Sequence, residues 1–529
     1  MRSSIASHLV RTRPPAGEPG DVDRTADTAA FLEDAAHVAG GFAAEVVFPR
    51  SERDVADIVR TAGAVLPVGA QSSLTGGATP RGEIVLSTSR MRTLDVDASS
   101  RVRAGAGVTL VEIGARLRAV GALYPPAPTF LGATVGGTVS TNAAGAATFK
   151  YGTTRSWVDG LTVVLANGEV LDLTRGECAA HPDGYFDVAY ASGNVVRVPV
   201  PRYTMPDVPK VSAGYFAGPG MDLIDLFIGC EGTLGVITAA TLRSVSPAPA
   251  ACLVFVTFAD VSRALSFVHA LRAESQRTWK GRPGGLDVSA IEHMDARSLA
   301  LLREDGVDAR LGLSLDPAAS IGLLITLDLP PGTAAFEVYD AFGASDDDAS
   351  TASSPISHFV HLLASFGAVD DALVATPGDT AGADRLIALR EAVPIAVNSR
   401  VGRAKRDIDA RIEKTAADVI VPFEHFAGWL AFCENEWRTR GLDGAVWGHI
   451  SDGNVHPNVI PQRYDDVVAG KEAVLACGRE AIRLGGSPLA EHGVGRSAVK
   501  QRLLAELYGA DGIADMRAVK RALDPEWKL

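Results

Sequence analysis

The chain has 529 residues, of which 47% are hydrophobic and 21% are charged, and its formal net charge is −13. A chain of this length exceeds what one hydrophobic core supports, so we expect two or three domains. The acidic balance argues against a nucleic-acid partner, because binding to phosphates needs clustered lysines and arginines.

The cysteines are widely spaced and form no Cys-x-x-Cys pair. This spacing argues against iron–sulfur ligation, a cysteine-type zinc site and a disulfide framework, and it favours a reducing compartment. The N-terminus lacks the apolar segment of a signal peptide, and no run approaches the roughly 18 apolar residues of a spanning helix. We therefore expect a cytoplasmic protein and leave peripheral contact with a membrane open.

The first expected elements follow a polar leader, residues 1–41, which we expect to be helical or irregular. Residues 46–49 predict a strand, Ser51 predicts the N-cap of a helix that ends near Gly63, and residues 65–68 predict a second strand. Residues 69–78, which come next, are mostly glycine, alanine, serine and threonine. Exposed backbone N–H groups and hydroxyls suit a phosphate, although a plain surface loop has the same composition.

Two further segments have the same texture, and we expect the first of them to be a second loop. Residues 132–145 contain no side chain larger than Val or Asn, and residues 229–238 form a third small-residue element that turns into a strand. Between them, residues 160–165 predict a strand that is closed by a turn at 166–169. Three such segments between residues 69 and 238 indicate a large cofactor that is wrapped by backbone.

The second half of the chain begins after a turn-rich seam at residues 246–249. We expect strands at 252–258 and 322–327 and helices at 261–273 and 383–393, the last of them stopped by Pro394. Mixed strands and helices of this kind are typical of an α+β domain with an antiparallel sheet.

Two histidines flank a sharp reversal near the end of the chain. His449 and His456 enclose an Asp-Gly-Asn sequence, which predicts a strand, a tight turn and a second strand. Glu491 and His492 follow farther on. Two imidazoles and one carboxylate leave a coordination position open, as in a catalytic zinc site, and His492 would then serve to move a proton. Spacing alone leaves open a solvated turn that binds no metal.

Together these motifs resemble the vanillyl-alcohol oxidase / p-cresol methylhydroxylase superfamily of flavoproteins. The C-terminal half resembles its branch of D-lactate dehydrogenase, the glycolate oxidase large subunit and D-2-hydroxyglutarate dehydrogenase. The resemblance covers about residues 42–524 and is carried by residues 67–78, 136–145, 151–152, 230–235, 449–456 and 491–493. It implies an α+β fold: a two-subdomain FAD-binding domain of the p-cresol methylhydroxylase type (42–248), then an α+β cap domain with an antiparallel sheet (249–529), the FAD-linked oxidase C-terminal domain that carries the substrate and metal sites.

The resemblance assigns non-covalent FAD to the glycine-rich segments. Relatives with covalent flavin often carry a histidine in the first loop, where this chain has Gln71, Ser72 and Ser73. The implied cofactor-binding residues are Pro67, Gly69, Ala70, Gln71, Ser72, Ser73, Leu74, Thr75, Gly76, Pro128, Thr129, Gly132, Thr134, Gly136, Gly137, Ser140, Asn142, Gly145, Gly152, Glu231, Gly232 and Ile237.

The resemblance also implies the reacting residues. It places the substrate carboxylate at Arg390 and Lys414, for each of which a surface ion pair is the alternative, and it adds Asn458 as a substrate contact. It implies a divalent metal on His449, His456 and Glu491, zinc by ligand type with manganese and iron as alternatives. His492 is the expected general base.

These roles describe an FAD-dependent dehydrogenase that oxidises a D-2-hydroxy acid, such as D-lactate, glycolate or D-2-hydroxyglutarate, to the 2-oxo acid. We expect a homo-oligomer and an external electron acceptor: a quinone, a cytochrome, an electron-transfer flavoprotein, an iron–sulfur protein or oxygen. Two alternatives stay open. One is a flavin transferase like alkylglycerone-phosphate synthase, disfavoured because a single histidine follows Glu491, and the other is a flavin subunit of an electron-transfer complex.

Overall fold

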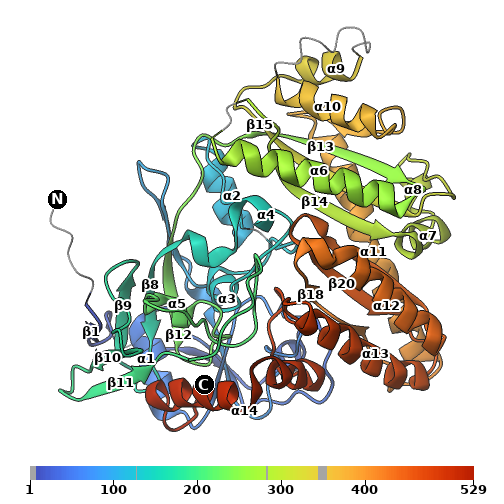
Figure 1. Ribbon diagram of the computed structural model, residues 1–529. Helices are drawn as coiled ribbons and strands as arrows, with labels where there is room; N and C mark the ends of the chain where they lie inside the picture. The colour runs from blue at the N-terminus through green and yellow to red at the C-terminus, as the bar shows by residue number, and fades with distance from the viewer. Residues whose placement is uncertain (1–6, 19, 127, 282–283, 344–353) are drawn as a thin grey trace. The chain divides into compact units, whose positions relative to one another are not determined.

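The computed structural model describes residues 7–18, 20–126, 128–281, 284–343 and 354–529, and it divides the chain into two compact units (Figure 1). Unit 1 comprises Met1–Gly145, Gly152–Ser246 and Leu489–Leu529, and unit 2 comprises Ala146–Tyr151 and Pro247–Pro488. Each unit has a hydrophobic core of its own. The division departs from the expected domain boundaries in two places, because residues 489–529 belong to unit 1 and residues 146–151 to unit 2.

The described part of unit 1 contains three sheets. In the four-stranded sheet β3, β5 and β4 are parallel and β2 is antiparallel to β3, whereas the five-stranded sheet β6-β7-β12-β8-β9 is antiparallel throughout. In the three-stranded sheet β1 is parallel to β10, and β11 is antiparallel to β10. The strands are β1 Leu9–Arg11, β2 Asp23–Thr25, β3 Val46–Phe48, β4 Val65–Val68, β5 Ile84–Ser87, β6 Leu94–Val96, β7 Val102–Gly105, β8 Val158–Val164, β9 Val170–Thr174, β10 Tyr185–Ala189, β11 Val195–Pro199 and β12 Val236–Leu242.

The helices of unit 1 are mostly short. They are α1 Glu52–Thr61, α2 Leu110–Arg118, α3 Val135–Ser140, α5 Ile224–Phe227 and α14 Ala498–Leu523, with 3-10 turns at Ala29–Phe31, Thr88–Arg90 and Thr154–Trp157. The predicted helix after Ser51 is confirmed as α1, where the Ser51 side chain accepts the Asp54 N–H and the Asp54 side chain accepts the Ser51 N–H. The predicted strand at 65–68 is confirmed as β4.

Two expectations for unit 1 are corrected. The leader, expected to be helical or irregular, contributes the strands β1 and β2, because Leu9 pairs with Asp187 and Asp23 pairs with Phe48. Strands of three residues form because of their partners elsewhere in the chain, so the sequence around them shows no strand pattern. The second small-residue segment is partly helical, since α3 occupies its middle.

The C-terminal segment joins unit 1 through polar contacts of its last residues. The Lys520 ammonium donates to the carbonyl of Thr233 and to that of Leu529, each at 2.7 Å, and the N–H of Val65 donates to the carbonyl of Lys528 at 2.7 Å. Val519 and Leu523 are buried in the hydrophobic core of the unit. These contacts explain why the tail belongs with residues that lie far earlier in the chain.

Unit 2 is built on an antiparallel sheet of eight strands in the order β16-β13-β15-β14-β19-β20-β17, with β18 also paired to β20. Its central strands are long apolar runs, which suits burial on both faces. The strands are β13 Ala250–Phe258, β14 Val288–Asp295, β15 Ile321–Leu329, β16 Leu373–Ala375, β17 Thr415–Ala416, β18 Val419–Ile420, β19 Gly444–His449 and β20 Asn454–Val459.

Several helices of unit 2 pack on this sheet, with α6 lying along β13 and β14, and α12 lies beside α13 (Figure 1). They are α4 Thr148–Tyr151, α6 Val261–Trp279, α7 Ala296–Glu304, α8 Val307–Arg310, α9 Ala335–Gly343, α10 Pro355–Ser365, α11 Thr380–Asp407, α12 Phe426–Arg440 and α13 Tyr464–Arg483, with 3-10 turns at Phe423–His425 and Ile450–Asp452. The predicted stop at Pro394 is wrong, because α11 continues through it to Asp407. Val397 and Val401 are buried beyond the proline, and their burial offsets the hydrogen bond that a proline removes.

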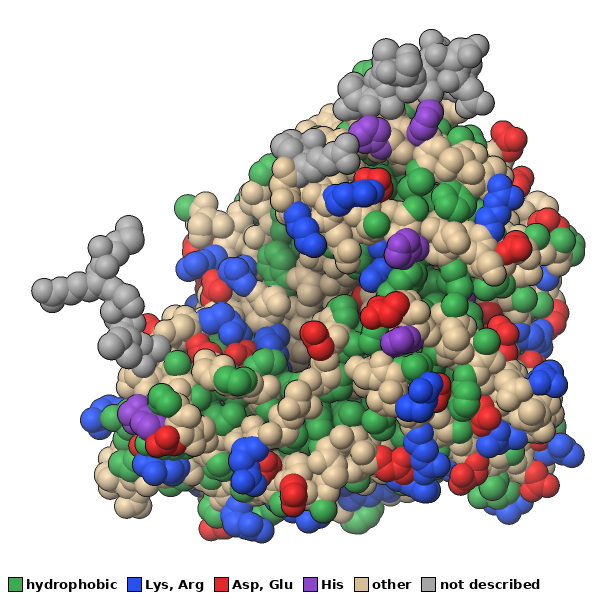
Figure 2. All heavy atoms as spheres, viewed as in Figure 1, with side chains coloured by type: hydrophobic (Ala, Val, Ile, Leu, Met, Phe, Trp, Pro, Cys, Tyr) green, Lys and Arg blue, Asp and Glu red, His purple; other side chains and the backbone are tan. Residues whose placement is uncertain are grey.

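No helix in the described ranges is long and apolar enough to cross a membrane. Figure 2 shows lysine and arginine side chains interspersed with aspartate and glutamate over the face in view. This mixture agrees with the acidic composition and the scattered positive charge of the sequence.

Candidate functional site

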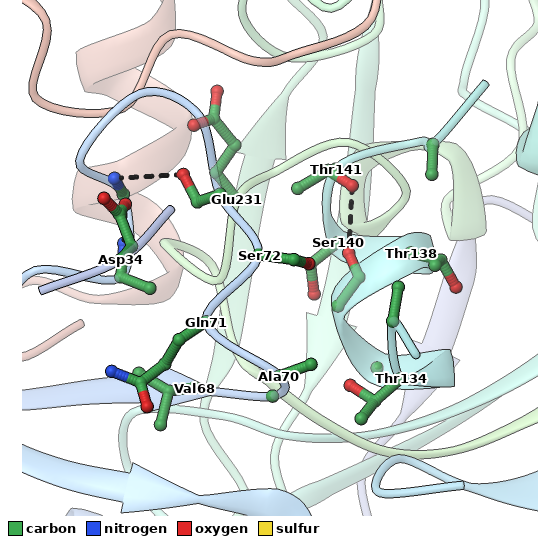
Figure 3. Close-up of a pocket in the computed structure, with 18 of the residues that line it drawn as sticks. Asp34, Val68, Ala70, Gln71, Ser72, Thr134, Thr138, Ser140, Thr141 and Glu231 are labelled. Carbon is green, nitrogen blue, oxygen red and sulfur yellow. Dashed lines mark hydrogen bonds between the residues drawn. The ribbon is translucent and has the colours of Figure 1, made fainter. Parts of the chain in front are cut away.

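A cavity of about 710 Å³ lies within unit 1. It is lined by the loop after β4, by the segment that contains α3 and by the loop before β12. In the close-up, Ala70, Gln71 and Ser72 of the first loop stand opposite Thr134, Thr138 and Ser140 of the α3 segment (Figure 3). The three small-residue segments of the sequence therefore meet around one cavity.

Glycines allow these segments to approach closely. A Cβ at Gly69 would lie 2.2 Å from the Thr134 hydroxyl, and one at Gly136 would lie 2.8 Å from the Ala106 Cβ. A Cβ at Gly235 would lie 2.5 Å from a methyl of Val163. A side chain at Gly69 would push the first loop away from Thr134, and side chains at Gly136 or Gly235 would push the lining away from Ala106 and Val163 behind it.

The chemistry of the lining fits a cofactor that carries phosphates. The lining residues of the described chain include no lysine or arginine, while Ser72, Ser73, Thr75, Ser140 and Thr141 offer hydroxyls beside the backbone of the glycine-rich loop. Neutral hydroxyls and backbone N–H groups are suitable donors to a pyrophosphate. FAD therefore fits the donor chemistry of this cavity, whose volume lies within the range of about 300–1,000 Å³ that is typical of cofactor sites.

Three non-glycine residues of these segments have left-handed backbones: Gln71 (φ 52°), Asn142 (φ 48°) and Glu231 (φ 55°). Such conformations cost energy and persist only when surrounding contacts impose them. At Glu231 the contacts are visible, since its carboxylate accepts the N–H groups of Val494 and Gly495, each at 2.8 Å. Burial raises the pKa of Glu231, and these two hydrogen bonds partly oppose the rise.

Most of the residues predicted to bind the cofactor line the cavity. Those that do are Pro67, Gly69, Ala70, Gln71, Ser72, Ser73, Leu74, Thr75, Pro128, Thr129, Thr134, Gly136, Gly137, Ser140, Glu231, Gly232 and Ile237. Those that do not are Gly76, Gly132, Asn142, Gly145 and Gly152. Three of these five shape the backbone of the loops: the Asn142 side-chain oxygen accepts the Arg155 N–H at 2.9 Å, and Gly76 and Gly152 have positive φ.

Other lining residues were not predicted. Asp34, Ala35 and His37 come from the leader, Phe130 comes just before the second small-residue segment, and Thr138 and Thr141 lie within that segment. The leader residues gave no signal because their position depends on tertiary contacts, such as the N–H of Ala78 donating to the Asp34 carboxylate at 3.3 Å.

Glu491 and His492 line the same cavity. The His492 Nε2 lies 3.5 Å from Glu491 Oε1, and the ammonium of the fully buried Lys210 donates to Glu491 Oε2 at 2.9 Å. Lys210 also donates to the Gly145 carbonyl at 3.4 Å. A predicted metal ligand and a predicted base therefore stand side by side at the predicted flavin site, and a buried cation that the sequence did not single out orients the carboxylate.

The predicted hairpin of unit 2 is confirmed. His449 ends β19, a 3-10 turn and Gly453 (φ 86°) reverse the chain, and β20 begins at Asn454. The register pairs Trp447 with His456 and Ala445 with Asn458, so His449, His456 and Asn458 lie on one face of the hairpin. Both imidazoles are buried, and their ring centroids are 5.4 Å apart.

Glu292 of β14 joins this face. The register places it opposite His449, whose Nδ1 lies 3.2 Å from Glu292 Oε1. The other oxygen, Oε2, accepts from Nε of Arg390 at 3.0 Å and lies 3.0 Å from its Nη2. Burial by itself raises the pKa of Glu292, but the charges of Arg390 and His449 outweigh burial and lower it to about 2.

Arg390 is therefore buried in an ion pair on α11, which the expected alternative of a surface pair did not anticipate. Lys414 immediately precedes β17 and is partly exposed, and the Asn458 side-chain amide donates to the His456 carbonyl at 2.9 Å. His456 has its own acidic neighbour, since its Nδ1 lies 3.5 Å from Oδ1 of the buried Asp418.

The metal-ligand prediction falls on both units. The structure brings His449 together with His456 in unit 2, and Glu491 together with His492 in unit 1. Imidazoles with a carboxylate beside the other ring nitrogen are a donor set that suits zinc. Sequence reasoning missed the charged partners Glu292, Asp418 and Lys210. The available signal at Glu292 was a charged residue within a strand that also contains Ala290, Ile291 and Met294.

Comparisons with known proteins agree with this geometry. The FAD binding domain family matches residues 43–174, and the family of the C-terminal domain of FAD linked oxidases matches residues 248–529. A D-2-hydroxyglutarate dehydrogenase of Xanthomonas citri pv. viticola is 29% identical over 496 residues, which cover 92% of this chain and 87% of that protein. A D-lactate dehydrogenase of Archaeoglobus fulgidus is 29% identical over 489 residues, covering 91% and 89%.

Among solved structures, an alkyldihydroxyacetonephosphate synthase superposes with a TM-score of 0.58 at 16% identity, covering 95% of this chain and 82% of that one. At this identity the likeness concerns the fold alone. The C-terminal family by itself spans more than half of the chain. The chain thus belongs to the FAD-linked oxidases of the vanillyl-alcohol oxidase / p-cresol methylhydroxylase superfamily, as its sequence motifs predicted.

Proposed function

We propose that this chain is an FAD-dependent dehydrogenase that oxidises a D-2-hydroxy acid to the corresponding 2-oxo acid. Its family makes it an oxidoreductase. The observation that carries the proposal is that Glu491 and His492 line the same cavity as the three glycine-rich segments. A ligand and a base at the flavin cavity are what the removal of a hydroxyl proton beside an electron acceptor requires. The names of the relatives, a D-2-hydroxyglutarate and a D-lactate dehydrogenase, support the substrate class.

In the proposed mechanism, separate residues of this chain bind the substrate carboxylate and accept the hydroxyl proton. Arg390, with Lys414 and Asn458, holds the substrate carboxylate and fixes the orientation of the α-carbon. His492 accepts the hydroxyl proton at its imidazole. FAD, when bound, supplies the acceptor for the hydride of the α-carbon.

His449, His456 and Glu491 would hold a divalent metal, and this assignment follows from the resemblance of their motifs. Zinc is the first choice by ligand type, with manganese and iron as alternatives. Such an ion would lower the pKa of the substrate hydroxyl. Glu292 beside His449, Asp418 beside His456 and Lys210 beside Glu491 would orient the three ligands.

The proposal also covers the choice of hydroxy acid and the electron acceptor. D-lactate, glycolate and D-2-hydroxyglutarate are the candidate substrates, and a small change in an apolar pocket discriminates among them by only about 1–3 kcal/mol. Electrons leave to an external acceptor, and the working enzyme is a homo-oligomer with non-covalent FAD. The proposed substrate and metal residues all follow residue 248, within the range that matches the C-terminal family, although Glu491 and His492 belong to unit 1.

The test is anaerobic reduction of the purified, FAD-loaded chain by a panel of the three hydroxy acids. We expect the absorbance of the oxidised flavin to disappear with at least one of the three acids. If that acid is D-lactate or D-2-hydroxyglutarate, the absorbance should persist with its L-enantiomer, whereas glycolate is achiral and has no such control. A flavin that no hydroxy acid reduces would contradict the dehydrogenase and favour a transferase without net redox chemistry.

His456→Ala tests the metal. We expect this variant to lose its bound metal, measured by elemental analysis, and most of its turnover, while it retains FAD. His425→Ala is the matched control, because His425 is an exposed histidine of the same unit. A His456→Ala variant that is metal-free and fully active would refute the metal-assisted scheme.

A further inference from the structure

The carboxylate of Glu292 contacts two residues that have different expected tasks. Its Oε1 lies 3.2 Å from the Nδ1 of His449, and its Oε2 accepts from Nε of Arg390 at 3.0 Å. Each oxygen thus faces one partner. His449 is an expected metal ligand and Arg390 is an expected contact of the substrate carboxylate. The Glu292 side chain therefore contacts one residue from each expected site.

The fold fixes this arrangement firmly. Glu292 and His449 are directly opposite each other on the paired strands β14 and β19, which puts their side chains on one face of the sheet. All three side chains are nearly inaccessible to solvent, at 12% for Glu292, 7% for Arg390 and 2% for His449. A buried ion pair contributes geometry more than stability, because desolvation offsets much of its attraction.

The contact also selects the tautomer of His449. A carboxylate beside Nδ1 favours the proton on that nitrogen, which leaves the lone pair on Nε2. His449 can then present only Nε2 to a metal. The Arg390 guanidinium gives Nε and Nη2 to Glu292, so its Nη1 edge is the part that remains for a substrate carboxylate.

We propose that Glu292 is a positioning residue that fixes the Nε2-presenting tautomer of His449 and the orientation of Arg390 together, so that the affinities for metal and for substrate depend on one carboxylate. The inference rests on the proposed function, since it takes His449 as a metal ligand and Arg390 as a substrate contact. It adds a coupling that neither assignment contains.

The experiment measures zinc affinity and substrate kinetics in the FAD-loaded full chain. Zinc dissociation constants come from competition with a chromophoric chelator, and KM and kcat come from the hydroxy acid that reduces the wild-type flavin best. For Glu292→Gln we expect zinc affinity to fall by about 10–100-fold and KM to rise with a smaller change in kcat. Glu292→Asp, which keeps the charge, should recover part of both losses.

Arg390→Met tests whether metal binding and substrate binding are coupled through Glu292 or are independent. Arg390 has no metal-ligating atom, so a residue that only grips substrate would leave zinc affinity unmoved when it is replaced. We expect Arg390→Met to weaken zinc binding by about threefold or more, because Glu292 loses the partner that holds its Oε2. Glu391→Gln, which removes the neighbouring carboxylate on α11, should change neither quantity.

The outcomes are distinct. If wild type binds zinc and its flavin is reduced by a hydroxy acid, but Glu292→Gln and Arg390→Met both retain wild-type zinc affinity, the coupling is refuted and the proposed function stands. If Glu292→Gln does not retain FAD, Arg390→Met and Glu292→Asp decide by the same criterion. If wild type neither binds zinc nor undergoes flavin reduction, the proposed function fails and the coupling fails with it.

Discussion

Substitution of Gly495 by alanine tests how tightly the segment after His492 is held against the first cofactor loop. An added Cβ would lie 2.3 Å from the Thr75 hydroxyl and 2.6 Å from the Thr75 carbonyl oxygen, and the backbone at Gly495 has a φ of +52°. Thr75 is buried, lines the cavity and accepts the Arg496 N–H at 2.9 Å, so it cannot move aside without breaking contacts.

Two costs add at this position. The left-handed backbone costs about 1–2 kcal/mol for a residue with a Cβ, and overpacking a closed site costs about 1–3 kcal/mol more. We expect Gly495→Ala to lower the free energy of unfolding by about 2–5 kcal/mol in total and to weaken FAD binding, because the displaced Thr75 belongs to the cavity wall.

Gly220→Ala is the matched control, because Gly220 lies in the same unit with a φ of +65° and a Cβ there would meet nothing within 4 Å. It should lose only the first cost and should retain wild-type FAD affinity. Thermal unfolding by circular dichroism and FAD titration by fluorescence measure both quantities, and we expect Gly495→Ala to melt at least about 2 °C below Gly220→Ala. Equal melting temperatures and equal FAD affinities would refute the close packing of Gly495 on Thr75.

Two further predictions concern partly buried charged groups of unit 2. Lys150→Met removes the ammonium that contacts Asp287 at 2.8 Å and Asp328 at 2.7 Å. Chemical denaturation should show that the free energy of unfolding falls by about 3–5 kcal/mol, and adding Asp328→Asn should restore part of it. An unchanged free energy of unfolding in Lys150→Met would contradict the pairing. Burial raises the pKa of Asp295 to about 6 against the opposing hydrogen bonds from Ser298 and Val446. Because this folded-state pKa exceeds the unfolded value of about 3.9, the contribution of Asp295 to stability is full below pH of about 3.9 and declines as the pH rises through 6. Unfolding free energies measured from pH 4 to 7 should therefore decline less with pH in Asp295→Asn than in wild type, and identical slopes would count against the raised pKa.

Local patterns predicted the elements whose causes are local. Ser51 predicted the start of α1 because its capping box uses residues three apart, and the Asp-Gly-Asn sequence predicted the hairpin because the reversal is made at Gly453. The apolar run at 252–258 predicted β13, because a continuous apolar run is also a local feature of the sequence. The stop at Pro394 failed because a local rule was outweighed by the burial of Val397 and Val401.

In the candidate site too, the residues with a local sequence signal were predicted and those fixed by tertiary contacts were not. Glycine-rich composition predicted the residues that wrap the cavity, because a close backbone approach requires the absence of side chains. The partners of the expected ligands could not be predicted. Glu292 is opposite His449 only through the register of β14 with β19, and Lys210 reaches Glu491 across a separation of 281 residues.

The sequence by itself indicated that this chain binds a large cofactor through backbone and that its expected metal ligands lie on a hairpin and in a Glu-His pair, because composition and turn chemistry are local properties. The tertiary structure decided that residues 489–529 fold with unit 1, that Glu491 and His492 line the cavity with the glycine-rich segments, and that Arg390 is paired with Glu292. These outcomes depend on strand register and on burial between segments far apart in the chain, which no local pattern records.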